Sequence, residues 1–159
     1  MVTLETHSEE ATEDAGERIG RALSRGAVVG LIGPLGAGKT VLVRGIARAC
    51  GVDESEVASP TFLTAAEYGG RLPVVHIDLY RHAAVPPDPE WLAELIDGDG
   101  VAVIEWFEQL PDADRLDALV VEIAPGAEDD HRTLRVAARG ARSDAALRAL
   151  AGEGSGAAA

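Results

Sequence analysis

Short apolar runs alternate along the chain with segments whose apolar residues recur at helical spacing. A run of about four to eight apolar residues is typical of a buried strand, whereas apolar residues three and four positions apart mark one face of a helix. The pattern predicts strands at residues 2–6, 28–32, 74–81, 101–106, 119–124 and 133–138. It predicts helices at residues 8–24, 41–50 and 90–96, and a short last helix capped by Ser143.

Strands that alternate with helices favour a sheet covered by helices on both faces. The last two strands differ, because only a charged turn links them, which favours an antiparallel hairpin. We therefore expect an α/β fold: a three-layer sandwich with a central, mostly parallel sheet and an antiparallel C-terminal hairpin. Residues 1–151 are predicted to form one domain, and the small residues of 152–159 a disordered tail.

A glycine-rich segment joins the second predicted strand to the second predicted helix. It matches the phosphate-loop pattern G-x-x-x-x-G-K-[ST] in the required strand and helix context. Its candidate nucleotide-binding residues are Gly33, Pro34, Leu35, Gly36, Ala37, Gly38, Lys39, Thr40 and Val41. Glycines let several backbone N–H groups point at one anion, and the helix that follows adds the positive end of its dipole. Lys39, the only lysine beside thirteen arginines, is expected to reach the β- and γ-phosphates, and the Thr40 hydroxyl to bind Mg²⁺.

Two predicted strands end in an acidic residue, Asp78 and Glu105. In phosphate-loop enzymes a carboxylate at the end of a neighbouring strand holds Mg²⁺, and another group orients or deprotonates the attacking water. The run before Glu105 is more purely apolar, so we assign Glu105 to the metal side and Asp78 to a switch or base role. Which of the two binds the metal stays open, and both are candidate Mg²⁺ ligands and catalytic residues together with Lys39.

Three further residues are candidates for the nucleotide site, and each also has an ordinary structural explanation. Alternation places His76 on the same face of its strand as Asp78, where we expect a packed or hydrogen-bonded histidine. For Trp106 three interpretations stay open: its ring packs on a nucleotide, on a partner protein, or in the core. Thr61, in the proline-fixed segment 59–62, either senses the γ-phosphate or belongs to an ordinary turn.

Composition narrows the classes of function. The formal net charge of −13 argues against the basic surface that nonspecific nucleic-acid binding needs. The single cysteine, Cys50, cannot form an internal disulfide and is expected to be buried. No apolar tract approaches a membrane span, and the acidic N-terminal segment does not resemble a signal peptide, so we expect a cytoplasmic protein without a membrane partner.

The conjunction of motifs resembles one family closely: the bacterial ATPase of the threonylcarbamoyladenosine tRNA-modification machinery, called TsaE or YjeE. The motifs that carry the resemblance are G-x-L-G-A-G-K-T at 33–40, Arg44-Gly45, S-P-T-F at 59–62, H-I-D-L-Y-R at 76–81 and I-E-W at 104–106 before Leu110-Pro111. It covers roughly residues 6–140, and this conjunction is far more specific than the loop alone.

The resemblance implies a small cytoplasmic protein, monomeric when alone, that binds ATP or ADP with Mg²⁺ and hydrolyses ATP weakly. It further implies action with the TsaB and TsaD subunits, which transfer threonylcarbamoyl to N6 of adenosine 37, so that tRNA is met only through the complex. By matching position, Thr61 and Asp78 would belong to switch-like elements, and Glu105 and Trp106 would lie by the nucleotide. Arg132 matches a family arginine and is a further candidate.

Three positions depart from the usual family pattern. They are Pro34 in place of an acid or amide, Val41 in place of a second threonine, and Phe107 in place of a proline. These departures put the tuning of nucleotide affinity in doubt, and leave the family resemblance intact.

Two other functions remain open at this stage. A small-molecule kinase shares the loop and fold but needs a second pocket and usually an arginine-bearing lid, for which only Arg71 and Arg81 are placed. A nucleotide sensor would bind ATP or ADP without hydrolysis, and it would need no competent base.

Overall fold

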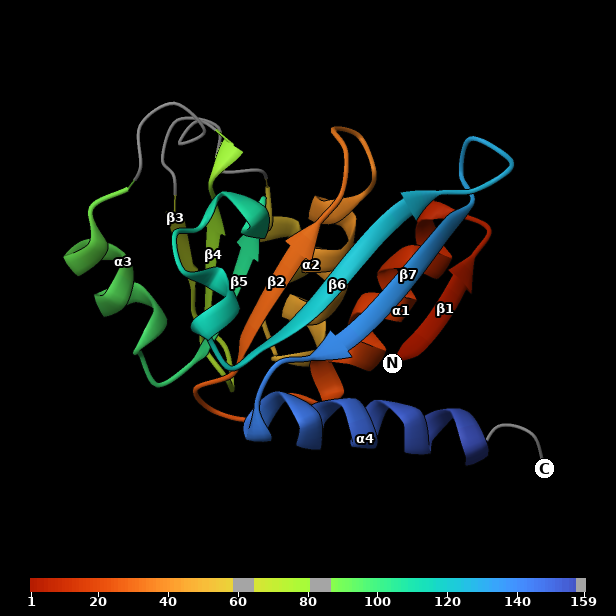
Figure 1. The fold of residues 1–159 in the computed structure, drawn as a ribbon. Coiled ribbons are helices and arrows are strands. Elements are labelled where there is room, and N and C mark those ends of the chain that lie inside the picture. Colours follow the sequence, from red (N-terminus) through yellow and green to blue (C-terminus); the bar gives the residue numbers. More distant parts are fainter. Residues whose placement is uncertain (59–64, 81–86, 157–159) are drawn as a thin grey trace.

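The computed structural model describes residues 1–58, 65–80 and 87–156, which form one seven-stranded sheet with helices on its two faces (Figure 1). The strands are β1 (Val2–Thr6), β2 (Val28–Ile32), β3 (Ala65–Tyr68), β4 (Val74–Asp78), β5 (Val101–Glu105), β6 (Ala118–Pro125) and β7 (Arg132–Ala138). The helices are α1 (Glu9–Arg21), α2 (Lys39–Ala49), α3 (Pro89–Ile96) and α4 (Ala141–Gly156).

The centre of the sheet is parallel and its edges are antiparallel. In the order β1-β7-β6-β2-β5-β4-β3, the neighbours β6, β2, β5 and β4 pair in parallel. The hairpin of β6 and β7 is antiparallel, β1 pairs antiparallel with β7, and β3 pairs antiparallel with β4. The predicted α/β fold with its parallel centre and C-terminal hairpin is therefore confirmed. The sequence pattern missed β3, whose residues Ala65–Tyr68 include two alanines and a glutamate of low strand propensity.

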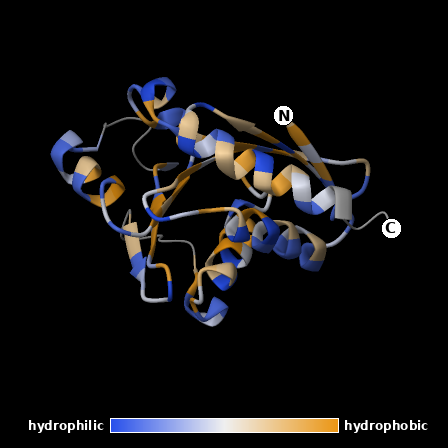
Figure 2. Cartoon of the chain, turned by 90° about the horizontal axis from the view of Figure 1, so that it is seen from below, coloured by the Kyte–Doolittle hydropathy of each residue, from blue (hydrophilic) through white to orange (hydrophobic). Residues whose placement is uncertain are grey.

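Two apolar cores lie on opposite faces of the sheet, and the three-layer arrangement is confirmed. Helices α1, α2 and α4 pack over one face, where Val29, Leu31 and Val103 are fully buried. Helix α3 and the turn after β5 pack over the other face with Ala102 and Ile104. In Figure 2 the strands are coloured mostly as hydrophobic, whereas the helices that cover them carry both hydrophilic and hydrophobic residues. Because β5 is buried on both faces, its sequence is a continuous apolar run instead of an alternating one.

Helices α1 and α2 approach so closely that glycine is required at their crossing. A Cβ at Gly45 would lie 1.9 Å from the carbonyl oxygen of Glu13, and one at Gly16 would lie 2.3 Å from that of Leu42. Beside the crossing, the Arg48 guanidinium pairs with four carboxylates, those of Glu13, Asp14, Glu17 and Glu54. These contacts fix α2, and with it the loop that leads into α2.

The last helix differs from its prediction at both ends. Helix α4 begins at Ala141, and the Ser143 hydroxyl, inside its first turn, accepts hydrogen bonds from the backbone N–H groups of Arg139 and Gly140. The helix continues to Gly156, so the predicted disordered tail is wrong for residues 152–156. Within the described part of the chain, α4 is the longest helix, and none of the helices there combines the length and apolar character needed to cross a bilayer.

The glycine at the helix crossing gives a direct test of this packing. We expect Gly45→Ala to lower the free energy of unfolding by about 1–3 kcal/mol, because the new methyl group overpacks the α1–α2 contact. Urea unfolding followed by circular dichroism measures the change. The matched control is Gly152→Ala in α4, where an added Cβ meets nothing within 4 Å and helix propensity predicts a gain of up to about 1 kcal/mol. Equal effects of the two substitutions would contradict the packing described.

Candidate functional site

The glycine-rich loop lies between the end of β2 at Ile32 and the start of α2 at Lys39. Gly36 and Gly38 have φ angles of 78° and 100°, which side-chain-bearing residues rarely adopt. Gly38 is also the N-cap of α2, so no side-chain hydrogen bond caps the start of this helix. The tip of the loop, with Pro34 and Leu35, is exposed. The loop thus presents backbone groups and the positive end of a helix at the carboxyl edge of the parallel strands.

Arg132 joins this loop to the C-terminal hairpin. Its Nε donates to the Ala37 carbonyl at 2.7 Å, and a terminal nitrogen lies 3.5 Å from the Gly36 carbonyl. The other terminal nitrogen donates to the carbonyls of Asp129 and His131, at 2.5 and 2.7 Å. Arg132, predicted as a nucleotide-binding residue, therefore contacts the loop backbone from the start of β7.

Lys39 is almost fully buried, with 6% of its surface exposed. Its ammonium group donates to the carbonyl oxygens of Gly33 at 2.5 Å and Pro34 at 2.8 Å. The indole ring of Trp106 covers it, with 4.0 Å between Nζ and the ring centroid. Burial lowers the pKa of Lys39, and the carboxylates of Glu105, Glu108 and Asp78 act in the opposite direction.

Trp106 reaches the lysine because the chain turns sharply as β5 ends. Its backbone is left-handed, with φ 58° and ψ 44°, which is uncommon for an aromatic residue and costs conformational energy. The ring also contacts that of Tyr80, with 5.0 Å between centroids. The turn sets the indole beside the ammonium group, so the structure brings Trp106 into the candidate site.

The two predicted carboxylates end neighbouring strands at the same level. Asp78 and Glu105 are register partners in the parallel pair of β4 and β5. Glu105 is 3% exposed, and the Thr40 hydroxyl donates to its two oxygens at 3.2 and 3.3 Å. Asp78 is partly exposed, and its Oδ1 accepts from the backbone N–H of Tyr80 at 2.9 Å. Lys39, Thr40, Glu105 and Trp106 thus meet, with Asp78 beside them.

The donor set of this cluster fits Mg²⁺. The Thr40 hydroxyl and the Glu105 carboxylate offer oxygen atoms, and the Asp78 carboxylate lies on the adjacent strand. A hard cation such as Mg²⁺ prefers oxygen ligands and is commonly held by one or two carboxylates together with phosphate oxygens. These residues could therefore hold the metal of a bound nucleotide.

The expected packed, hydrogen-bonded His76 is confirmed, but sequence reasoning did not find its partners, Glu105 and Tyr68. The His76 ring, fully buried, places Nε2 2.5 Å from Glu105 Oε2, and its Nδ1 lies 3.4 Å from the Tyr68 hydroxyl. The shared strand face of His76 and Asp78 was a usable signal for the histidine. No sequence signal pointed to Tyr68, because its strand was not predicted.

A cavity of about 190 Å³ opens between the end of β1 and the start of β7. Thr6, His7, His131 and Arg132 line it, and the rings of His7 and His131 meet edge to face with centroids 4.4 Å apart. Arg132 connects the cavity to the glycine-rich loop, because it also donates to the Ala37 carbonyl.

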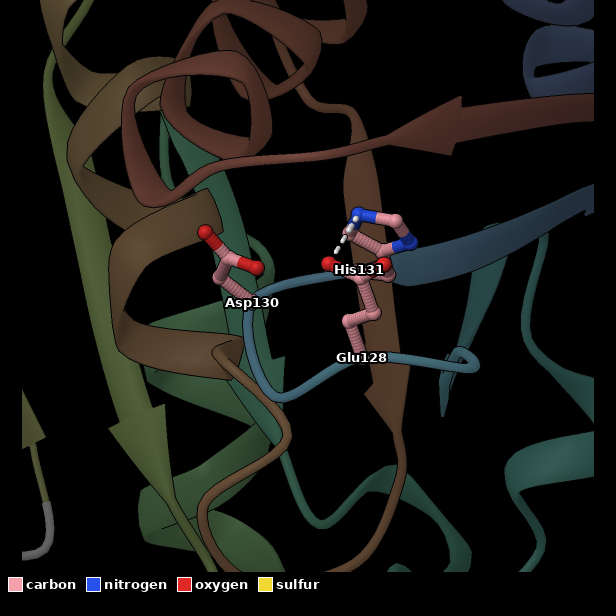
Figure 3. Close-up of side chains that lie close together, drawn as sticks. All are labelled: Glu128, Asp130 and His131. Atoms are coloured by element: carbon pink, nitrogen blue, oxygen red, sulfur yellow. Dashed lines mark ion pairs between the residues drawn. The ribbon is translucent and has the colours of Figure 1, made fainter.

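The turn between β6 and β7 carries a second group of titratable side chains. Figure 3 shows Glu128 and His131 directed toward each other, with Asp130 nearby. His131 Nε2 lies 3.5 Å from Glu128 Oε2. Glu128 and Asp130 are exposed, and exposed acidic turns of this kind are common without an ion. We therefore describe this group as part of the turn and assign no ligand to it.

The remaining sequence candidates that the structure describes lie outside the cluster. Thr61 and Arg81 fall outside the described residues. Val41 is partly buried in the first turn of α2. Arg71 donates to the backbone carbonyl of Ala49, and Arg44 pairs with carboxylates of α1. Within the described part of the chain, these arginines give no evidence of a lid.

The single lysine makes the electrostatics of the site measurable. We expect the Lys39 amine to titrate below its usual pKa of 10.5, because burial disfavours the charged form more than the nearby carboxylates favour it. The folded state then binds fewer protons than the unfolded state, so this group makes folding more favourable as pH rises toward 10.5. NMR of ¹³C-labelled lysine gives one ε-carbon signal to follow. A titration at or above 10.5 would contradict the buried environment.

Comparison with known proteins identifies a family for this chain. The sequence model of the family described as "Threonylcarbamoyl adenosine biosynthesis protein TsaE" matches residues 6–134. A Treponema pallidum protein named tRNA threonylcarbamoyladenosine biosynthesis protein TsaE is 43% identical over 106 residues, which are 66% of this chain and 78% of that protein. The protein of the same name from Mycobacterium bovis is 44% identical over 121 residues, 67% of this chain and 68% of that one.

A solved structure is similar over nearly the whole chain. The crystal structure of YdiB from Bacillus subtilis superposes with a TM-score of 0.76 at 28% sequence identity, covering 96% of this chain and 95% of that one. The family model spans the strand, loop and helix around Lys39, both acidic strand ends, and the start of β7 with Arg132. The chain belongs to the TsaE family of threonylcarbamoyladenosine biosynthesis proteins.

Proposed function

We propose that this protein binds ATP with Mg²⁺, hydrolyses it slowly, and so supports formation of N6-threonylcarbamoyladenosine in tRNA. The observation that carries the proposal is the meeting of Lys39, Thr40 and Glu105 at one end of a glycine-rich loop. Membership of the TsaE family supports the biosynthetic role. The ATPase activity is our inference from the site.

Each residue of the cluster has a defined task in this proposal. The loop amides and the start of α2 bind the phosphates, and Lys39 exchanges the carbonyls of Gly33 and Pro34 for phosphate oxygens. Thr40 and Glu105 hold Mg²⁺, which when bound neutralises charge on the phosphate oxygens. Asp78, at the mouth of the site, orients the attacking water. Positioning and charge neutralisation account for most catalysis of phosphoryl transfer, so the chain needs no covalent nucleophile.

We place the nucleoside end of the ligand in the cavity between the end of β1 and the start of β7. The cavity shares Arg132 with the loop, and it is lined by the rings of His7 and His131, which offer flat surfaces for a base. Arg132 then supports binding indirectly, because it holds the carbonyls of Gly36 and Ala37 that shape the loop.

We further propose that the protein acts in the cytoplasm with the TsaB and TsaD proteins and meets tRNA only through them. The net charge of −13 favours this arrangement, since an acidic chain repels the phosphate backbone of RNA. Docking of the partners would complete the site, which explains why turnover of the isolated chain should be slow.

Phosphate release with and without TsaB–TsaD tests the proposal. We expect the partners to stimulate release by the wild-type protein. Glu105→Gln and Asp78→Asn should each lower the stimulated rate at least about tenfold, because the first weakens metal binding and the second removes the group that orients water. Glu122→Gln, on the exposed face of β6, is the matched control and should retain the rate.

Three outcomes would contradict this function. Intact release in both acidic variants would remove the catalytic assignment. Release that is absent even in the complete complex would favour a nucleotide sensor. A phosphorylated small molecule formed without free phosphate would favour a kinase.

A further inference from the structure

A line of hydrogen-bonding groups extends from the metal side of the site into the protein interior. His76 is fully buried on β4, and its Nε2 lies 2.5 Å from Glu105 Oε2. On the other side of the ring, Nδ1 lies 3.4 Å from the hydroxyl of Tyr68 on β3. That hydroxyl also lies 3.4 Å from the backbone carbonyl of Ala58.

The chemistry of these groups determines where the hydrogens lie. An ionised carboxylate can only accept, so in the pair with Glu105 the His76 Nε2 carries the hydrogen. In a neutral imidazole Nδ1 is then the acceptor, and the only donor that the structure places within reach among the described residues is the Tyr68 hydroxyl.

The Tyr68 hydroxyl has a single hydrogen and two acceptors at equal distance. Ala58 is exposed, so water can satisfy its carbonyl, whereas Nδ1 of the fully buried His76 would lose its partner. Donation to His76 is therefore favoured. Burial raises the pKa of Tyr68, and the charges of Glu105 and Glu56 also raise it against the effect of the Ala58 hydrogen bond, so the hydroxyl keeps its hydrogen at neutral pH.

The bond to His76 is the shortest contact that the Glu105 carboxylate makes among the described residues. The Thr40 hydroxyl lies 3.2 and 3.3 Å from the two oxygens and so favours no single rotation of the group. The last torsion of a glutamate is broad, and an external contact must fix it. The 2.5 Å bond to Oε2 supplies that constraint, and it holds the carboxylate with both oxygens within reach of the Thr40 hydroxyl.

We propose that His76 is a positioning residue that orients the Glu105 carboxylate for a divalent cation, and that Tyr68 supports this arrangement by donating to His76 Nδ1. The identity of the cation rests on the proposed function, whereas the orientation of Glu105 does not. Hydrogen-bond partners behind metal ligands commonly change metal affinity by about 10- to 100-fold when removed. Tyr68 acts on Glu105 only through its hydrogen bond with His76.

A purely structural role for the buried imidazole predicts a different result. If His76 only filled space, any well-packed substitute would serve, and the chemistry of its ring nitrogens would not matter. The pair His76→Leu and His76→Gln separates the two roles. Leucine fills the space without a donor, whereas glutamine restores an N–H group that can reach Glu105.

The experiment measures the affinity for ADP by calorimetry, once with Mg²⁺ and once with EDTA, for each folded variant. The ratio of the two affinities reports metal binding separately from phosphate binding. We expect His76→Leu to reduce this ratio at least about tenfold, His76→Gln to stay within about threefold of wild type, and Tyr68→Phe to reduce it about threefold. Affinities in EDTA should change less than twofold. Glu67→Gln, an exposed neighbour on β3, is the control.

A spectroscopic readout needs neither nucleotide nor metal. In ¹⁵N NMR the wild-type His76 ring should show a protonated Nε2 and an unprotonated Nδ1. Tyr68→Phe should shift the Nδ1 signal, because Nδ1 loses its donor while Glu105 still holds the hydrogen on Nε2. The signal is assigned by its loss in His76→Gln. This readout tests the inference even if His76→Leu does not fold.

The possible failures are distinguishable. A wild-type protein that gives no heat with ADP would refute the proposed function, while the ¹⁵N measurement would still test the role of Tyr68. The positioning role of His76 would be overturned by an unchanged metal ratio in His76→Leu or by an equal loss in folded His76→Gln. An unaltered His76 spectrum in Tyr68→Phe would overturn the supporting role of Tyr68.

Discussion

A buried positive charge and a buried negative charge lie together at the edge of the parallel sheet, and the rest of the site depends on how they are accommodated. Lys39 is 6% exposed and Glu105 is 3% exposed. Burial of either charge alone would be costly, so each is surrounded by polar contacts. Loop carbonyls and the indole ring surround the ammonium group, while Thr40 and His76 contact the carboxylate. In the proposed function, phosphate oxygens replace the loop carbonyls beside Lys39, and Thr40 and Glu105 would hold the metal.

Packing far from the loop keeps these charges in place. Helix α2 carries Lys39 and Thr40 at its first turn, and its position is fixed by the close crossing with α1 at Gly45. Arg132 fixes the other side of the loop through the carbonyls of Gly36 and Ala37. Because the sheet places β5 beside β2, Glu105 ends next to the loop. The fold therefore positions the site from three sides.

The sequence predicted the parts of the structure that depend on local pattern. Apolar runs gave the central strands, and the motif at 33–40 gave the loop, because glycines and one lysine at fixed spacing have few other uses. The hydrogen bond between His76 and Glu105 could not be predicted from the sequence, because it depends on the register of β4 and β5. Tyr68 was missed with its weakly patterned strand, and the end of α4 was misplaced because small residues carry little helical periodicity.

The central claim is that the loop, Lys39 and the oxygen ligands form a binding site for a nucleoside triphosphate with Mg²⁺. Isothermal titration calorimetry of the folded protein with ATP and Mg²⁺ tests it most directly, with Lys39→Met as the variant and Arg135→Ala, on the exposed face of β7, as the control. We expect saturable binding at one site, at least about tenfold weaker in Lys39→Met and unchanged in the control. No heat with the wild-type protein, or equal affinity in Lys39→Met, would contradict it.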